Sequence, residues 1–188
     1  PYDDRLVLED EEIYVEINKN GEFIYINKTM SQDATTELDE QKAWNHVEAF
    51  LNKIGTKEEE TANFIKSTEN GYLEMHCSQN YKDAFLDKSY MEIKASNKGV
   101  IYLKMLWFET VNNGKTKNEI IPPIKALMKL AELYKDNEQD ITVYNISLGY
   151  YFNSDIEQVK ELDVVTVQEG TAIPVWKVNT GKDNIYIN

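Results

Sequence analysis

Alternating apolar and polar residues, repeated in several short segments, constrain the fold of this chain more than any other feature. The clearest case is the segment from Gly170 to Asn188, which reads GTAIPVWKVNTGKDNIYIN. Because successive side chains of a strand point to opposite faces, its period of two predicts a strand. One face of that strand would carry Ala172, Pro174, Trp176 and Val178. Turn residues then lead into a second apolar run, Ile185-Tyr186-Ile187, so we predict a hairpin with one large aromatic residue on each arm.

Two earlier hairpins are predicted by the same pattern. Ile13–Ile17 and Phe23–Asn27 alternate on either side of Asn20-Gly21, a dipeptide that favours a tight turn because it tolerates positive φ. Ser89–Ala95 and Val100–Phe108 flank a second turn. The later arm of this hairpin, VIYLKMLWF, is apolar at nearly every position, which is typical of a central strand covered on both faces.

The remaining apolar runs complete the predicted sheet. Gly71–Ser78 is predicted as a strand, followed by an irregular stretch from Gln79 to Asp87. Thr142–Phe152 and Leu162–Val167 are predicted as two more strands. The acidic leading segment, Pro1–Glu12, lacks the regular spacing of calcium ligands and is predicted to be solvated.

Two segments have the 3.6-residue apolar period of a helix. The first starts near Thr36 or Asp39, whose side chains can accept hydrogen bonds from the first turn, and it ends at Gly55. Its apolar stripe consists of Ala43, Val47, Phe50, Leu51 and Ile54, flanked by Trp44. The second starts at Pro122-Pro123, which a first helical turn tolerates, and extends to about Asp136. Its predicted apolar face consists of Ile124, Leu127, Met128, Ala131 and Tyr134.

Together these elements predict an α+β fold with two related units, each a helix packed on an antiparallel sheet, preceded by an N-terminal hairpin. With 188 residues, 41% of them hydrophobic, the chain can form one compact domain with a real core. We predict an N-terminal segment and hairpin at 1–30, a first unit at 31–114 and a second unit at 115–188, with the boundary near Asn112–Lys115. A degenerate duplication would place four features at similar positions in the two units: Ala43 and Ala126, and Gly71-Tyr72 and Gly149-Tyr150.

The composition excludes several classes of function. A formal net charge of −13 argues against nucleic acid as a partner, because phosphate binding needs Lys and Arg, and against direct attraction to anionic lipid head groups. The single cysteine, Cys77, cannot form an intramolecular disulfide. No run of about 18 apolar residues occurs, and the chain starts at Pro1 without a methionine, so a leader or an anchor can precede it.

No catalytic signature is found. His76 and Cys77 are neighbours on a predicted strand, so their side chains point to opposite faces and do not readily form a nucleophile–base pair. The other histidine, His46, lies on the first predicted helix, and no spacing typical of a metal site or of a phosphate-binding loop occurs. We therefore predict no enzymatic activity, no metal and no cofactor. The 12 tyrosines and three tryptophans are expected to pack in the core more than to line a ligand groove.

The closing segment also resembles a known family. Ala172–Val178 (AIPVWKV), a short turn and Ile185–Asn188 (IYIN) are similar to the C-terminal signature of YycI-type regulatory proteins. The helix Ile124–Tyr134, followed by a GYY strand at 149–151, resembles the last unit of that family, and the family's helix-on-sheet units are similar to PepSY domains. The residues that carry the resemblance, as structural positions, are Gly149, Tyr150, Ala172, Pro174, Trp176 and Tyr186.

The resemblance implies a bacterial, non-enzymatic regulator with this chain as its extracytoplasmic domain at the cell membrane. A single N-terminal anchor, outside these residues, would hold it there. The implied partners are the WalK sensor histidine kinase, which serves cell-wall homeostasis in a two-component system, and a YycH-type protein. The alternative is a PepSY-like module that binds a peptide, a wall fragment or a protease. An enzyme that uses Cys77 or carboxylates is the weakest hypothesis.

Overall fold

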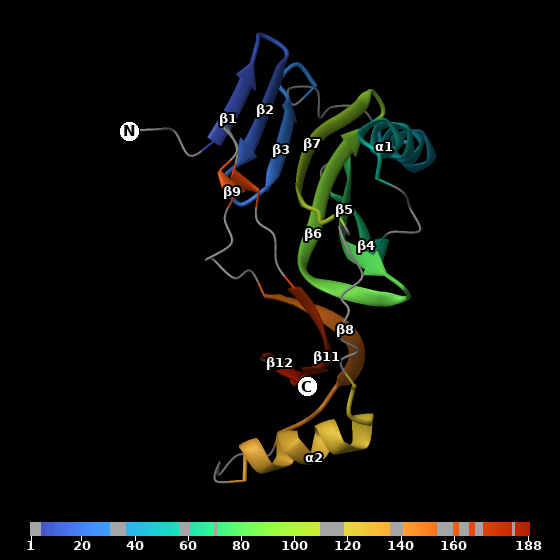
Figure 1. The fold of residues 1–188 in the computed structure, drawn as a ribbon. Helices are drawn as coiled ribbons and strands as arrows, with labels where there is room; N and C mark the ends of the chain where they lie inside the picture. The colour runs from blue at the N-terminus through green and yellow to red at the C-terminus, as the bar shows by residue number, and fades with distance from the viewer. Residues whose placement is uncertain are drawn as a thin grey trace.

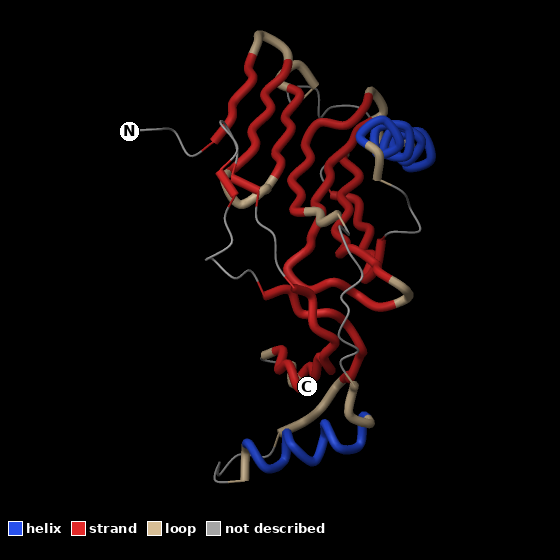
Figure 2. The backbone as a smooth tube through the Cα atoms, viewed as in Figure 1, coloured by secondary structure: helices blue, strands red, loops and turns tan. Residues whose placement is uncertain are grey.

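The computed structural model describes residues 5–30, 37–56, 61–69, 71–109, 119–135, 141–153, 160–161, 166–167, 171–181 and 183–188. Within these residues the chain is mostly β-sheet with two helices (Figure 1, Figure 2). The first half of the chain, residues 5–109, contains β1 (Arg5–Glu9), β2 (Ile13–Asn18), β3 (Phe23–Asn27), α1 (Glu40–Ile54), β4 (Thr61–Glu69), β5 (Tyr72–Tyr81), β6 (Ala84–Ser96) and β7 (Gly99–Leu106). The second half, residues 119–188, contains α2 (Pro123–Leu133), β8 (Asn145–Asn153), β9 (Lys160–Glu161), β10 (Thr166–Val167), β11 (Thr171–Asn179) and β12 (Asn184–Ile187).

One mixed sheet runs through both halves. Its strand order is β1-β2-β3-β7-β6-β8-β11-β12, with β5 on the other side of β6 and β4 beyond β5. All its pairs are antiparallel except β6–β8, and β9 and β10 form a separate two-stranded sheet. The predicted α+β class is therefore confirmed, but the strands form one open mixed sheet. The two related units and the division at 1–30, 31–114 and 115–188 stay predictions.

Strand β6 joins the two halves. Residues 90–96 of β6 pair with β7, and most of its length pairs with β5 on the other side. Near its start, Phe85 and Leu86 pair in parallel with Gly149 and Tyr150 of β8. Figure 1 shows β6 curving from the level of α1 down to the level of β8 and β11. This single bent strand therefore connects the sheet around α1 to the sheet around α2.

Helix α1 covers the core of the first half, as its sequence predicts. Asp39 is its N-cap and accepts a hydrogen bond from the Lys42 N–H at 3.1 Å, and Gly55 ends the helix in the left-handed region with φ of 84°. Its buried residues are Ala43, Val47 and Leu51, while Trp44, Phe50 and Ile54 pack at the margin. They meet a sheet face that includes Leu73, Met75, Met91, Ile93 and Leu103. Full burial of each such side chain contributes about 1.5–3 kcal/mol.

Helix α2 covers a smaller core, and the predicted apolar face of this helix is wrong except at Tyr134, which packs against that core. The buried residues of α2 are Ala126 and Leu130, which pack against Val178 and Ile187. Ile124 and Met128 are 63% and 66% exposed. Residues 124–134 contain apolar side chains around much of the helix, so the period alone could not select the face that meets the sheet.

In three places the structure has strands that the sequence did not predict. Residues 5–9 of the leading segment form β1, which pairs with β2 in register from Arg5↔Asn18 to Glu9↔Tyr14. The stretch 79–87, predicted as irregular, belongs to β5 and β6, which are joined by a tight turn at Lys82 and Asp83, both with positive φ. Residues 61–69 form β4, which no pattern had indicated. The predicted boundary at 112–115 and residues 162–165 lie outside the described residues.

The predicted hairpins are present as strand pairs. β2 pairs with β3 from Ile13↔Asn27 to Ile17↔Phe23, β6 pairs with β7, and β11 pairs with β12 from Trp176↔Ile187 to Asn179↔Asn184. The Gly-Tyr pairs of the two halves, in contrast, are not in equivalent positions. Gly71 precedes β5 with φ of 78°, whereas Gly149 lies inside β8.

Candidate functional site

Three of the six sequence-predicted motif residues, Gly149, Tyr150 and Tyr186, lie where the two halves of the sheet meet. We call this place the joint and define it by Phe85, Leu86 and Asp87 of β6, Gly149 and Tyr150 of β8, and Tyr186 of β12. Cross-strand partners in the joint are Phe85↔Gly149 and Leu86↔Tyr150. Because partners side by side in a sheet share a face, the joint brings the aromatic residues of both halves into contact.

A bulge shapes the joint on the β6 side. The register between β5 and β6 shifts between Cys77 and Gln79, and Lys88 has φ of 66°, which is uncommon for a residue other than glycine. The Ser89 hydroxyl accepts a hydrogen bond from the Gln79 N–H at 2.8 Å and donates one to the Leu86 carbonyl. The unpaired backbone groups of the bulge are thus satisfied by a buried side chain, which fixes the bend of β6.

Gly149 permits the closest approach in the joint. A Cβ atom at this position would lie 2.2 Å from Cζ of Phe85, which is far inside van der Waals contact. Gly149 is in extended backbone, so the absence of a side chain, and not an unusual φ, explains glycine here. The Phe85 side chain, which is 7% exposed, occupies the space that a side chain at position 149 would need.

Four tyrosines, in two pairs, lie around this glycine contact. The rings of Tyr81 and Tyr150 lie 5.4 Å apart in an edge-on arrangement, and those of Tyr151 and Tyr186 lie 5.3 Å apart. The Tyr186 hydroxyl donates a 2.5 Å hydrogen bond to Oδ1 of Asp87. Burial, followed by this hydrogen bond to a carboxylate, raises the pKa of Tyr186 well above its ordinary value. The hydroxyl therefore stays protonated, and its hydrogen bond connects β12 to β6, although the two residues are 99 positions apart in the sequence.

A second link runs through Phe108, just after β7. Gln79 donates through Nε2 to the Phe108 carbonyl at 2.7 Å and accepts through Oε1 from the Phe108 N–H at 3.0 Å. The Phe108 ring then lies 4.4 Å from the ring of Phe152 in β8. A buried amide of the first half thus positions an aromatic contact with the second half.

The other motif residues lie further from the joint. Pro174 is opposite Tyr150 on β11, and Ala172 is an exposed residue opposite Phe152. The Trp176 indole donates to the Ile121 carbonyl at 2.8 Å, which fixes the segment before α2 on the second core. The sequence motif therefore identifies β8, β11 and β12, while the β6 residues Phe85 and Asp87 were missed because they fell in a stretch without periodicity.

Reactive side chains are not assembled into a catalytic arrangement among the described residues. His76 is exposed and Cys77 is buried, on opposite faces of β5 as the strand geometry predicts. Burial raises the pKa of the Cys77 thiol to about 11, so it is not a thiolate near neutral pH. His46 contacts the Asn97 carbonyl through Nε2 at 3.2 Å. No group of three or more potential metal ligands occurs in the part of the chain that the structure describes.

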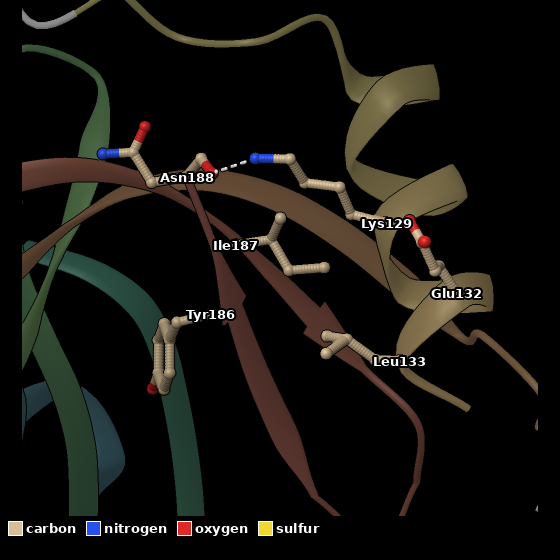
Figure 3. A pocket seen from close by; sticks show the side chains of 6 residues that line it. All are labelled: Lys129, Glu132, Leu133, Tyr186, Ile187 and Asn188. Atoms are coloured by element: carbon tan, nitrogen blue, oxygen red, sulfur yellow. Dashed lines mark hydrogen bonds between the residues drawn. The ribbon is translucent and has the colours of Figure 1, made fainter. Parts of the chain in front are cut away.

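A shallow groove lies between α2 and β12, at the far end of the sheet from β1. This groove encloses about 300 Å³ and is lined by Lys129, Glu132, Leu133, Tyr186, Ile187 and Asn188. Figure 3 shows Ile187 and Leu133 pointing toward one another across it, while Tyr186 points away from the helix. Lys129 donates to the Asn188 carbonyl at 2.7 Å, which ties the end of β12 to the helix.

Fold and joint together define a class of protein: an α+β protein on one bent mixed sheet, whose two halves are joined by the Tyr186–Asp87 hydrogen bond and by aromatic contacts. A model of the YycI protein family matches residues 15–188, and this chain belongs to the YycI family. The resemblance of its closing segment to that family is thus confirmed. No curated protein and no solved structure matches the chain. No helix among the described residues is long and apolar enough to span a membrane.

Proposed function

We propose that this chain is the extracytoplasmic domain of a non-enzymatic regulator of a membrane sensor histidine kinase. The observation that carries the proposal is the YycI family match over residues 15–188. The kinase is of the WalK type, in the two-component system for cell-wall homeostasis, and a YycH-type protein is the second partner. An N-terminal anchor would hold the domain at the outer face of the cell membrane.

The joint offers a physical route for such regulation. A partner that binds one half of the sheet can influence the other half because β6 is shared and because Tyr186–Asp87 and Gly149–Phe85 connect the halves. Regulation requires that the partner bind two arrangements with different affinity. In this proposal the signal is a change in partner binding, transmitted to the kinase across the membrane.

A PepSY-like peptide-binding module is the second candidate function. The groove between α2 and β12 favours it, because an apolar wall lies beside a strand edge that other described strands leave open. The two candidates differ in what the domain binds: a folded membrane-protein partner in the first, an extended peptide in the second.

Co-purification from membranes tests the proposed function. The full-length protein, with whatever precedes Pro1, is expressed with an affinity tag together with the kinase and the YycH-type protein, and the complex is isolated in mild detergent. We expect all three proteins to co-purify at a fixed ratio. A comparison variant, Gly149→Trp, places a large side chain against Phe85 and is expected to reduce the recovered partners. Recovery of the tagged protein alone would refute the proposal.

A further inference from the structure

We propose that the open edge of β12 binds an extended, acidic segment of a partner protein, which adds to the sheet as a further strand beneath α2. This inference rests on the second candidate function, since its ligand is an extended segment of a protein. Within the described residues, β12 pairs only with β11. Alternate residues of β12 therefore direct their N–H and C=O groups away from the sheet, where a peptide backbone can pair with them.

The sheet has other edges, and their sequences are less suited to strand addition. β1 (RLVLE) carries Arg5 and Glu9, and β4 carries Lys66 and a register shift against β5 between Ala62 and Ile65. Charges and bulges on edge strands oppose pairing with another chain. β12 (NIYI) has no charged residue and pairs with β11 without a register shift. Of these three edge strands, β12 therefore has the sequence most suited to pairing with an added strand.

The groove supplies a place for the side chains of the added strand. Residues of a strand alternate between two faces, so every second residue of the segment would point toward α2. There it would meet Leu133, which is 68% exposed, and the edge of Ile187. These positions favour apolar side chains. The arrangement of strand edge, groove and helix wall is visible in Figure 3.

The charge of α2 and of the residues that follow it indicates which polar residues the ligand should contain. Residues 123–135 contain Lys125, Lys129, Lys135 and the single acid Glu132, a net charge of +2 in a chain whose formal net charge is −13. Lys129 and Glu132 both line the groove, so the excess positive charge beside it comes from Lys125 and Lys135. A segment with Asp or Glu next to its apolar residues would be attracted to this surface, and would be repelled by the rest of the molecule. An acidic, alternating segment therefore fits this edge.

The test is a selection from a library of random octapeptides on the complete 188-residue chain. We expect the selected peptides to alternate apolar residues with other types and to be enriched in Asp and Glu. A synthetic peptide of the selected sequence should shift the backbone amide resonances of residues 185–188, and binding should weaken as salt is raised. N-methylation of alternate amides of that peptide, which removes strand pairing, should abolish binding.

Two variants that each add one negative charge test whether peptide binding depends on the groove or on α2 in general. Leu133→Glu places a carboxylate in the groove, and we expect binding to weaken at least about tenfold. Met128→Glu makes the same change at a residue that is 66% exposed and does not line the groove, and we expect less than about a twofold effect. Both residues are on the surface, so neither variant should unfold.

Several results would overturn this inference. They are the absence of any selected peptide, full binding by the N-methylated peptide, and equal effects of Leu133→Glu and Met128→Glu. Because the readout is binding by the domain alone, it does not depend on the kinase. Peptide binding without co-purification of the kinase would refute only the proposed function, and co-purification without peptide binding would refute only this inference.

Discussion

Replacing Gly149 with alanine tests whether the joint is held by close contact between Gly149 and Phe85. The added Cβ would lie 2.2 Å from the Phe85 ring. Overpacking of a well-packed site typically costs about 1–3 kcal/mol, and Phe85 has little freedom to move because it is buried and the ammonium of Lys177 lies 4.9 Å from its ring centroid. We therefore expect Gly149→Ala to lower the free energy of unfolding by about 1–3 kcal/mol.

The double-mutant cycle with Phe85→Ala gives the decisive comparison. Phe85→Ala alone should cost about 3–5 kcal/mol, as for other buried phenylalanines. Once the ring is absent, Gly149→Ala should no longer clash, and alanine should be better than glycine in a strand by about 0.5–1 kcal/mol. The effect of Gly149→Ala should therefore change sign between the two backgrounds, which corresponds to a coupling free energy of about 1.5–4 kcal/mol.

Urea unfolding followed by tryptophan fluorescence measures these free energies. Trp176 reports on the second half and Trp44 on the first, so single-tryptophan versions also show whether both halves lose stability together. Ser147→Ala, two residues earlier on β8, is a matched control and should have an effect below about 0.5 kcal/mol. The reasoning is refuted if Gly149→Ala is neutral, or if it costs the same with and without the Phe85 ring.

Three further predictions follow from the first half of the chain. Asp39→Ala removes the N-cap of α1 and should destabilise the protein by about 0.5–2 kcal/mol in urea unfolding. Asp39→Asn should be close to neutral, because asparagine also caps a helix. Equal losses of stability for both variants would argue against capping. Burial raises the pKa of Glu22, but its hydrogen bonds with Tyr90 and Lys104 outweigh this, so its pKa is below the ordinary 4.5. The wild-type protein should therefore be more stable than Glu22→Gln above pH 4.5, and this difference in the free energy of unfolding should shrink as the pH falls through the lowered pKa. A constant difference from pH 7 to 3 would contradict this. Because the pKa of the Cys77 thiol is about 11, Cys77 should react with iodoacetamide at least about a hundredfold more slowly in the folded than in the unfolded protein. Similar rates in both states would show that the thiol is accessible in the folded protein.

Local signals in the sequence predicted the parts of the fold that depend on neighbouring residues. Helix α1 was predicted with its cap at Thr36 or Asp39, its end at Gly55 and its apolar stripe, because each signal lies within one segment; the structure selects Asp39 as the cap. The strand pairs around Asn20-Gly21 and before Ile185–Ile187 were predicted for the same reason. In such segments the turn residues and the apolar period agree, so local sequence is sufficient.

Long-range contacts explain what the sequence did not predict. Residues 79–87 lack a simple period because β5 and β6 contain a bulge there, and because Phe85 and Asp87 are matched to β8 and β12 and not to their own neighbours. The face of α2 depends on the position of β11 and β12 relative to the helix, which its own apolar residues do not specify. The motif residues Gly149 and Tyr186 were found, but their partners in β6 were not.

Kinase activity in a reconstituted membrane tests the central claim most directly. The full-length protein and the full-length sensor kinase are placed in the same liposomes, and the initial rate of kinase autophosphorylation is measured with the YycH-type protein present. Our account predicts that the rate changes severalfold when this protein is added, and that a version without its folded extracytoplasmic domain has no such effect. An unchanged rate, with the three proteins shown to be inserted in one orientation, would contradict the account.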